Sequence, residues 1–197
     1  AVPALETLDR IGLLERYLPA WGPVRCRPQR DPYHRSAVDV HLLESAAGVA
    51  MWLDDPGQDP LVARAVEAVT DRDALLLGAL LHDIGKRGEG DHVAVGTRVA
   101  AETLEHMGVS GPTADLALFL VAEHLLLSDT ATRRDLEDEN LVLGVADRIG
   151  DPTQLAALYL MTIADAEATG PALLPGARTL MFNVQHPGES QFSDWPQ

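Results

Sequence analysis

Apolar residues recur along most of this chain at the three- and four-residue spacing of a helix, and the alternation typical of half-buried strands is nearly absent. In residues 4–19, for example, leucine and isoleucine side chains would share one face. The segment 73–84 is almost wholly apolar, which predicts a helix at the centre of the fold. The pattern predicts an all-α protein with helices at residues 4–19, 36–53, 60–70, 73–84, 92–107, 113–126, 138–149 and 152–168.

Helix breakers and capping residues set the boundaries of these segments. The proline-rich stretch "PAWGPVRCRPQRDPY" (residues 19–33) predicts an irregular connector, because proline cannot donate a backbone hydrogen bond. Asp91 is placed to cap one helix at its start, and Gly108 is placed to end it. From residue 171 the periodicity is lost and prolines recur, so we expect the tail 171–197 to be loosely ordered.

Composition narrows the class of protein. The 197 residues suit one domain, and the formal net charge of −15 argues against nucleic-acid binding, which needs a basic surface. No apolar run approaches the roughly 18 residues of a membrane span, so we expect no membrane insertion. The single cysteine, Cys26, excludes an internal disulfide and fits a reducing, cytoplasmic location. The sequence leaves the oligomeric state open.

Five polar residues interrupt otherwise apolar segments. His41 lies on the apolar face of its helix, and His82 and Asp83 end the central segment in "LLHDIGKRGEGDH". His124 and Asp165 stand among apolar neighbours in "FLVAEHLLL" and "LYLMTIADAEATG". Each histidine alone is more often a satisfied core residue. A buried, unpaired carboxylate is different, because desolvating it costs roughly several kcal/mol. A divalent cation would satisfy the carboxylates and the imidazoles together.

The ligand types limit the choice of metal. Imidazole and carboxylate without thiolate suit iron, manganese, cobalt, zinc or nickel, and disfavour a structural cysteine-type zinc site. Helical bundles build such sites in their interiors from residues on several helices. We therefore expect one or two divalent metal ions inside the helical bundle.

The order of these residues, H…HD…D, resembles the signature of the HD superfamily of metal-dependent phosphohydrolases. The resemblance covers about residues 30–170 and implies an all-helical bundle, an HD domain, that cleaves phosphomonoesters or phosphodiesters. We accordingly divide the chain into an N-terminal helix and connector (1–29), the HD phosphohydrolase domain (30–170) and the tail (171–197).

Finer features resemble one branch of this superfamily. The stretches "DPYHRSAVDVHLLE", "LLLGALLHDIGKRGEGDH", "VAEHLLLSDTATRRDLED" and "TIADAEATGP" are similar to the HD domain of bifunctional PII uridylyltransferase/uridylyl-removing enzymes. No glycine-serine loop with paired aspartates is present to bind a nucleoside triphosphate, and the resemblance fades after Pro171. We therefore expect an isolated HD domain, without the transferase domain and the ligand-sensing ACT domains of that branch.

Residue by residue, the resemblance implies a set of metal ligands. The primary set is His41, His82, Asp83 and Asp165, and the histidines that match a second metal site are His92 and His124. With two ions bound, Asp83 would bridge them, which makes it a catalytic residue as well as a ligand. His106 and His186 are expected at the surface.

Four further residues are candidates for substrate binding. Lys86, the only lysine of the chain, follows Asp83 by three residues and could bind a phosphate oxygen as a catalytic cation; a plain helix C-terminal cation is the equal alternative. His34 lies in the matching "PYHR" segment. Arg133 and Arg134 could reach a nucleotide phosphate or a partner protein, although a solvated helix start explains them as well.

The resemblance implies a metal-dependent phosphodiesterase that removes the nucleotidyl group from a tyrosine of a PII-type signalling protein in nitrogen regulation. As an isolated domain it would also hydrolyse small phosphodiesters, including cyclic nucleotides. Two alternatives stay open: a phosphomonoesterase acting on nucleotides, and a non-catalytic module that senses a nucleotide or a metal.

Overall fold

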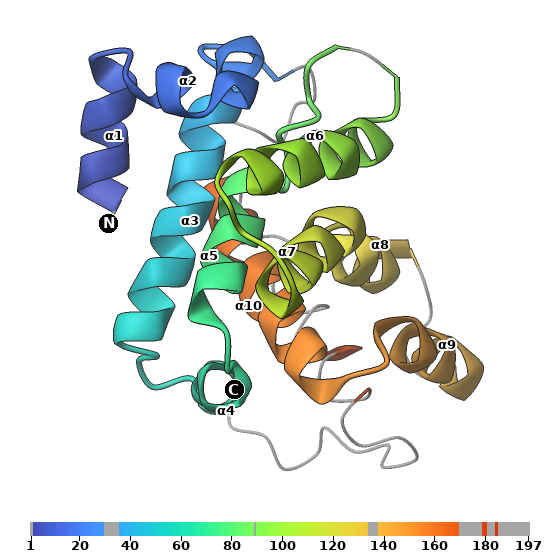
Figure 1. Ribbon diagram of the computed structural model, residues 1–197. Coiled ribbons are helices and arrows are strands. Elements are labelled where there is room, and N and C mark those ends of the chain that lie inside the picture. The colour runs from blue at the N-terminus through green and yellow to red at the C-terminus, as the bar shows by residue number, and fades with distance from the viewer. Residues whose placement is uncertain are drawn as a thin grey trace.

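Three helices lie side by side at the centre of the fold (Figure 1): α3 (Val38–Asp54), α5 (Arg72–Leu81) and α10 (Pro152–Thr169). The computed structural model describes residues 2–29, 36–88, 90–133, 138–169, 179–180 and 184. Within these residues it contains ten α-helices and one 3₁₀ helix, η1, and no strand, which confirms the predicted all-α class.

The other helices surround this centre. They are α1 (Val2–Arg10), α2 (Leu14–Tyr17), η1 (Pro19–Val24), α4 (Pro60–Ala68), α6 (His92–His106), α7 (Pro112–Glu123), α8 (Leu126–Arg133) and α9 (Glu139–Ile149). Helix α7 packs between α5 and α6, while α4 contacts the other side of α10. No helix in the described part of the chain is long and apolar enough to cross a membrane.

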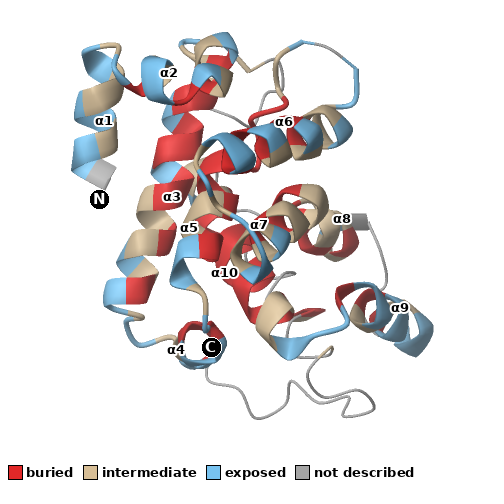
Figure 2. Cartoon of the chain, viewed as in Figure 1, coloured by how far each residue is buried: buried red, intermediate tan, exposed pale blue. Residues whose placement is uncertain are grey.

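Helix α10 runs through the core of the fold. Every residue from Leu155 to Ala164 is buried, as the red ribbon in Figure 2 shows. A helix that is apolar on all sides has to be surrounded by other helices, and α3, α4, α5 and α7 supply that surrounding. Any polar residue on the inner part of α10 is therefore held among side chains of several helices.

Aspartates begin several helices by accepting a backbone N–H. Asp71 accepts from Ala74 at the start of α5, and Asp91 accepts from Val93 at the start of α6, both at 2.9 Å. The predicted role of Asp91 is thereby confirmed. Beyond the end of α6, Gly108 has a φ of 73°, a left-handed conformation that glycine adopts without strain.

The predicted first helix, residues 4–19, is wrong. Gly12, with a φ of 71°, breaks it into α1 and α2, and η1 occupies the first part of the predicted connector. Tertiary contacts hold this bend, because the indole Nε1 of Trp21 donates to the Asp9 carboxylate at 2.8 Å and Arg25 donates to the Asp9 carbonyl at 2.8 Å. The indole ring is fully buried.

Helix α8 is absent from the sequence prediction, which ran one helix from residue 113 to 126. Helix α7 ends at Glu123, and the chain turns at His124 before α8 begins at Leu126. The apolar run "HLLL" hides this break, since it continues the pattern of α7 without a glycine or a proline. Most of the tail 171–197 lies outside the described residues. The division of the chain into residues 1–29, 30–170 and 171–197 stays a prediction.

Two glycines allow the segments near the centre to approach closely. A Cβ atom on Gly78 of α5 would lie 2.7 Å from Leu120 Cδ1 of α7. A Cβ atom on Gly85 would overlap the His92 carbonyl oxygen and the Gly96 backbone nitrogen of α6. Both contacts need a residue without a side chain, and each lies within a few residues of the polar groups singled out in the sequence.

We expect Gly85→Ala to destabilise the protein by roughly 1–3 kcal/mol or more, because backbone atoms of α6 cannot move aside as a flexible side chain can. The matched control is Gly144→Ala on the exposed side of α9, where an added Cβ meets nothing within 4 Å. That change should stabilise by roughly 0.5–1 kcal/mol through helix propensity. Urea unfolding of both variants measures the difference, and equal midpoints would contradict the close approach.

Candidate metal centre

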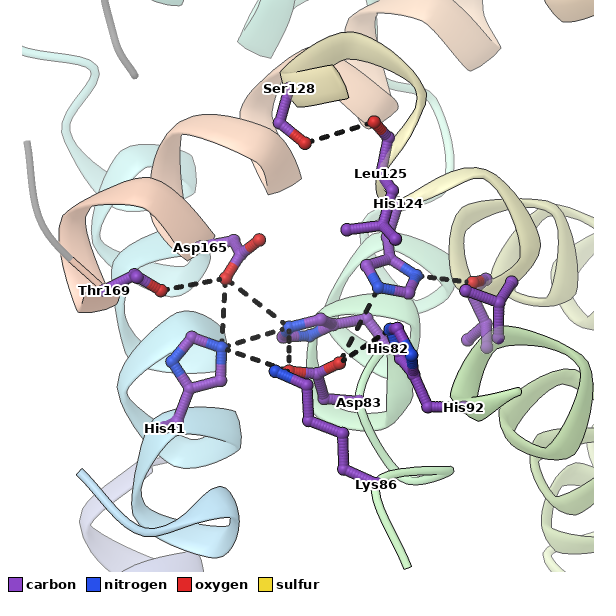
Figure 3. Close-up of polar contacts among 12 residues, drawn as sticks. His41, His82, Asp83, Lys86, His92, His124, Leu125, Ser128, Asp165 and Thr169 are labelled. Atoms are coloured by element: carbon purple, nitrogen blue, oxygen red, sulfur yellow. Dashed lines mark hydrogen bonds and ion pairs between the residues drawn. The ribbon is translucent and has the colours of Figure 1, made fainter. Parts of the chain in front are cut away.

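Six side chains from five segments meet between α3, α5 and α10 (Figure 3). Helices α3, α6 and α10 each contribute one of them, the turn that follows α5 contributes two, and the residue that ends α7 contributes the last. In chain order the cluster consists of His41, His82, Asp83, His92, His124 and Asp165. All six predicted metal ligands are thus brought together.

The first half of the cluster joins α3, the turn after α5, and α10. His41 Nε2 lies 3.0 Å from Asp165 Oδ1 and 3.2 Å from His82 Nε2. His82 Nε2 lies 3.6 Å from the same Asp165 oxygen. One ligand atom from each residue falls within 4.8 Å of the other two, so the three residues could hold one metal ion.

The second half joins the turn after α5 to α6 and α7. His124 Nε2 lies 3.6 Å from Asp83 Oδ1, and His92 Nε2 lies 3.9 Å from the same oxygen. These three residues also have ligand atoms within 4.8 Å of one another. The described residues therefore offer two adjacent groups of three, each with two imidazoles and one carboxylate.

Asp83 stands between the two groups. Its Oδ2 lies 3.6 Å from both His41 Nε2 and His82 Nε2, while its Oδ1 faces the histidines of the second group. The residue is only 2% exposed, as the sequence predicted for a carboxylate that needs compensation. Asp165 differs from that expectation, because 21% of its side chain is exposed.

The buried polar atoms fit bound cations. Among the described residues, Asp83 Oδ1 and His124 Nε2 have no hydrogen-bond partner although both atoms are buried. The Nδ1 atoms of His82 and His124 lie 2.9 and 2.8 Å from the carbonyl oxygens of Ala79 and Val121. Because a carbonyl only accepts, these contacts place a proton on Nδ1 and leave Nε2 of the neutral ring as a lone-pair donor, the arrangement usual for metal-binding histidines.

The histidines of the cluster differ in the direction in which their pKa values are shifted. Burial lowers the pKa of His82, but the neighbouring Asp83 and Asp165 outweigh it and raise this pKa to about 9. Burial and the charge of His82 lower the pKa of His124 to about 4, and burial also lowers the pKa of His41. The His82 imidazole is therefore protonated at neutral pH, while those of His41 and His124 are neutral.

The carboxylates depend on these positive charges. Burial raises the pKa of Asp165, yet hydrogen bonds to His41 and His82 hold it well below its ordinary range. Burial likewise acts to raise the pKa of Asp83, while the charges of His82 and Lys86 lower it. The side chains of Asp83 and Asp165 are both ionised at neutral pH, and the ionised carboxylate is the form that binds a metal ion.

The remaining predicted residues fall into three classes. Lys86 lies beside the cluster, with Nζ 2.6 Å from Asp83 Oδ2. His34 and Arg134 lie outside the described residues, as does the side chain of Arg133 at the end of α8. His106 is exposed, as predicted, and His186 lies outside the described residues.

Gln29 joins the site without having been predicted. Its Oε1 accepts a hydrogen bond from Lys86 Nζ at 2.7 Å. It stands in the proline-rich connector, where neither helical periodicity nor an apolar run marks it. Only the folding of the connector against the turn after α5 brings it here.

Comparison with protein families matches residues 38–150 to the HD domain. The chain belongs to the HD domain family. This match spans five of the six cluster residues, and Asp165 lies beyond its end. Membership confirms the predicted family and its metal-dependent hydrolase chemistry, and the two His/Asp groups provide places for metal ions. The identity of the metal stays open.

Several curated proteins that carry the same name are similar to this chain. The bifunctional uridylyltransferase/uridylyl-removing enzyme of Streptomyces coelicolor is 42% identical over 171 residues, and that of Mycobacterium tuberculosis is 41% identical over 173 residues. The enzyme of Thiobacillus denitrificans is 36% identical over 172 residues. These alignments cover 86–87% of this chain but 19–20% of the relatives, so the chain spans about a fifth of their length.

We expect the protein to bind two divalent ions, and the His92→Ala variant to bind one tightly, because His92 belongs only to the second group. Elemental analysis after dialysis against Mn²⁺ gives the stoichiometry. His106→Ala, a change on the same helix at an exposed position, should keep both ions. Two tightly held ions in His92→Ala would contradict the division into two groups.

Chelator-treated protein should lose stability between pH 7 and pH 9. The pKa of His82 rises from 6.5 to about 9 on folding, so its contribution is complete below about pH 6.5 and lost as pH rises through about 9. The pKa values of His41 and His124 are lowered, so both rings are neutral in either state across this window. Urea unfolding at successive pH values tests this, and His82→Gln should remove the decline.

Proposed function

We propose that this chain is a phosphodiesterase that hydrolyses the nucleotidyl-tyrosine bond of a modified PII-type protein and, as an isolated domain, small phosphodiesters including cyclic nucleotides. One observation carries the proposal: Asp83 turns one carboxylate oxygen toward each of two metal-binding groups, and a lysine ammonium stands beside it. The relatives named as uridylyl-removing enzymes support the choice of a nucleotidyl diester.

Three partly exposed residues form the open side of the cluster among the described residues. The rings of His41 and His82 are fully buried and that of His124 nearly so, whereas Lys86, His92 and Asp165 have 22%, 34% and 21% of their side chains exposed. A substrate therefore reaches the cluster past these three residues.

The residues of the cluster would hold two divalent ions, one in each group, with Asp83 shared between them. Bound ions of this kind lower the pKa of water and offset charge on a phosphoryl group. The chain contributes fixed positions: His82 and His124 are oriented by backbone carbonyls, so their Nε2 atoms need no rearrangement. Cys26 belongs to neither group, so no thiolate enters the donor set.

Lys86 would bind the substrate. Its ammonium lies at the open side of the cluster and is held by Asp83, so it can attract a phosphodiester oxygen as a point charge. A tyrosine leaving group has an ordinary pKa of about 10, so it departs with less help from a proton donor than an alkoxide. We accordingly expect the site to favour aryl diesters, such as the nucleotidyl-tyrosine diester of a cytoplasmic signalling protein.

We expect thymidine 5′-(p-nitrophenyl) phosphate, a nucleotidyl aryl diester, to be hydrolysed with a kcat/KM at least about tenfold above that of p-nitrophenyl phosphate, a monoester. Asp83→Asn should lower this kcat/KM by more than about 100-fold, since a metal ligand matters more than its supporting groups. Release of p-nitrophenol measures both quantities. Asp147→Asn, an exposed position on α9, is the matched control.

The alternatives predict other outcomes. Activity confined to the monoester would favour a phosphomonoesterase. Binding of uridine monophosphate with no turnover of either ester, in protein shown to contain metal, would favour a sensing module. Incubation with a uridylylated PII-type protein, followed by mass spectrometry, tests the physiological substrate directly; an unchanged mass would exclude that substrate.

A further inference from the structure

Gln29 is linked to the cluster through Lys86. The glutamine precedes the lysine by 57 residues, and its Oε1 accepts from the lysine Nζ at 2.7 Å. The same ammonium lies 2.6 Å from Asp83 Oδ2. The ammonium therefore lies between a neutral amide and a buried carboxylate, and the amide links it to the described part of the connector.

The connector that carries Gln29 is fixed to the first turn of α3. The backbone N–H of Val38 donates to the Arg27 carbonyl at 2.9 Å. The backbone N–H of Cys26 donates to the buried Asp39 carboxylate at 2.7 Å. Because the same helix also carries His41, the amide of Gln29 has a defined position relative to the cluster rather than that of a freely moving loop side chain.

The uncharged amide has a consequence for the lysine. A glutamine oxygen orients the ammonium without adding charge, whereas a carboxylate at this place would be the second beside the ammonium, after that of Asp83, and would remove its attraction for an anionic substrate. The amide is also costly for stability, since Gln29 Nε2 is buried without a hydrogen-bond partner among the described residues. A side chain selected for stability alone would have avoided that loss.

We propose that Gln29 is a positioning residue that holds the charged Lys86 ammonium at the open side of the cluster, where the substrate phosphodiester binds. The inference rests on the proposed function, in which Lys86 binds a phosphate oxygen. It assigns to the connector, 12 residues before His41, a part in substrate affinity.

The test is a double-mutant cycle of Gln29→Glu and Lys86→Met in metal-loaded protein. With thymidine 5′-(p-nitrophenyl) phosphate, Gln29→Glu should raise KM about tenfold, because the new carboxylate would neutralise the ammonium that attracts the anion. Its kcat should change less than about threefold. In the Lys86→Met background the same substitution should have a markedly smaller effect on KM, since no ammonium is left to position or neutralise.

Two further variants separate positioning from structure. Gln29→Leu has a similar size, removes the unpaired donor and should keep the melting temperature, yet it should raise KM because the lysine loses the amide oxygen as one of its acceptors. Gln58→Leu, the same substitution at an exposed site between α3 and α4, should leave KM unchanged. Elemental analysis of each variant should show the wild-type metal content.

Failure of this inference is distinguishable from failure of the proposed function. If the wild type hydrolyses the diester while Gln29→Glu leaves KM unchanged, or raises it equally in the Lys86→Met background, the role of Gln29 is overturned alone. Loss of metal or stability with an unchanged KM indicates a structural role and overturns it as well. Calorimetric binding of uridine monophosphate needs no turnover: a tenfold weaker affinity in Gln29→Glu, absent in the double variant, would sustain the positioning role even without hydrolysis.

Discussion

A carboxylate with almost no solvent contact, that of Asp83, is the constraint on which the site depends. It is 2% exposed and lies at the meeting point of α3, the turn after α5, α6 and α7. A charge in such a place needs compensation from every side. Four histidines and a lysine lie within 3.9 Å of its two oxygens: His41, His82, Lys86, His92 and His124. The polar cluster and the surrounding apolar helices are thus parts of one arrangement.

Close backbone approach makes that arrangement possible. Gly78 allows α5 to meet α7 one turn before His82 and His124, and the rings of these histidines have centroids 5.3 Å apart. Gly85 allows the turn that carries Asp83 to meet the start of α6, which carries His92. Side chains at either glycine would separate the segments, so the geometry of the cluster is determined by packing some distance from the polar atoms themselves.

Local sequence patterns were sufficient where one segment decides its own structure. The apolar segment 73–84 predicted a central helix, which corresponds to α5, and Asp91 predicted the start of α6, because both signals act within a few residues. They failed where a distant contact decides. Trp21 and Arg25 donate hydrogen bonds to Asp9 and thereby hold the bend that divides the first predicted helix. No pattern within residues 4–19 predicts these contacts.

The sequence by itself determined the all-α class, the family and the identity of the six converging side chains. The H…HD…D order and apolar surroundings mark five of these side chains, and His92 followed from the resemblance to the family. The resemblance also implied a primary set, a second pair of histidines and an Asp83 shared between two ions. Only the tertiary structure decided the distances between the ligand atoms, which place Asp83 with His92 and His124, and the contact of Gln29 in the connector with Lys86. These features depend on distances between residues dozens of positions apart, and such distances are set by helix packing rather than by local propensity.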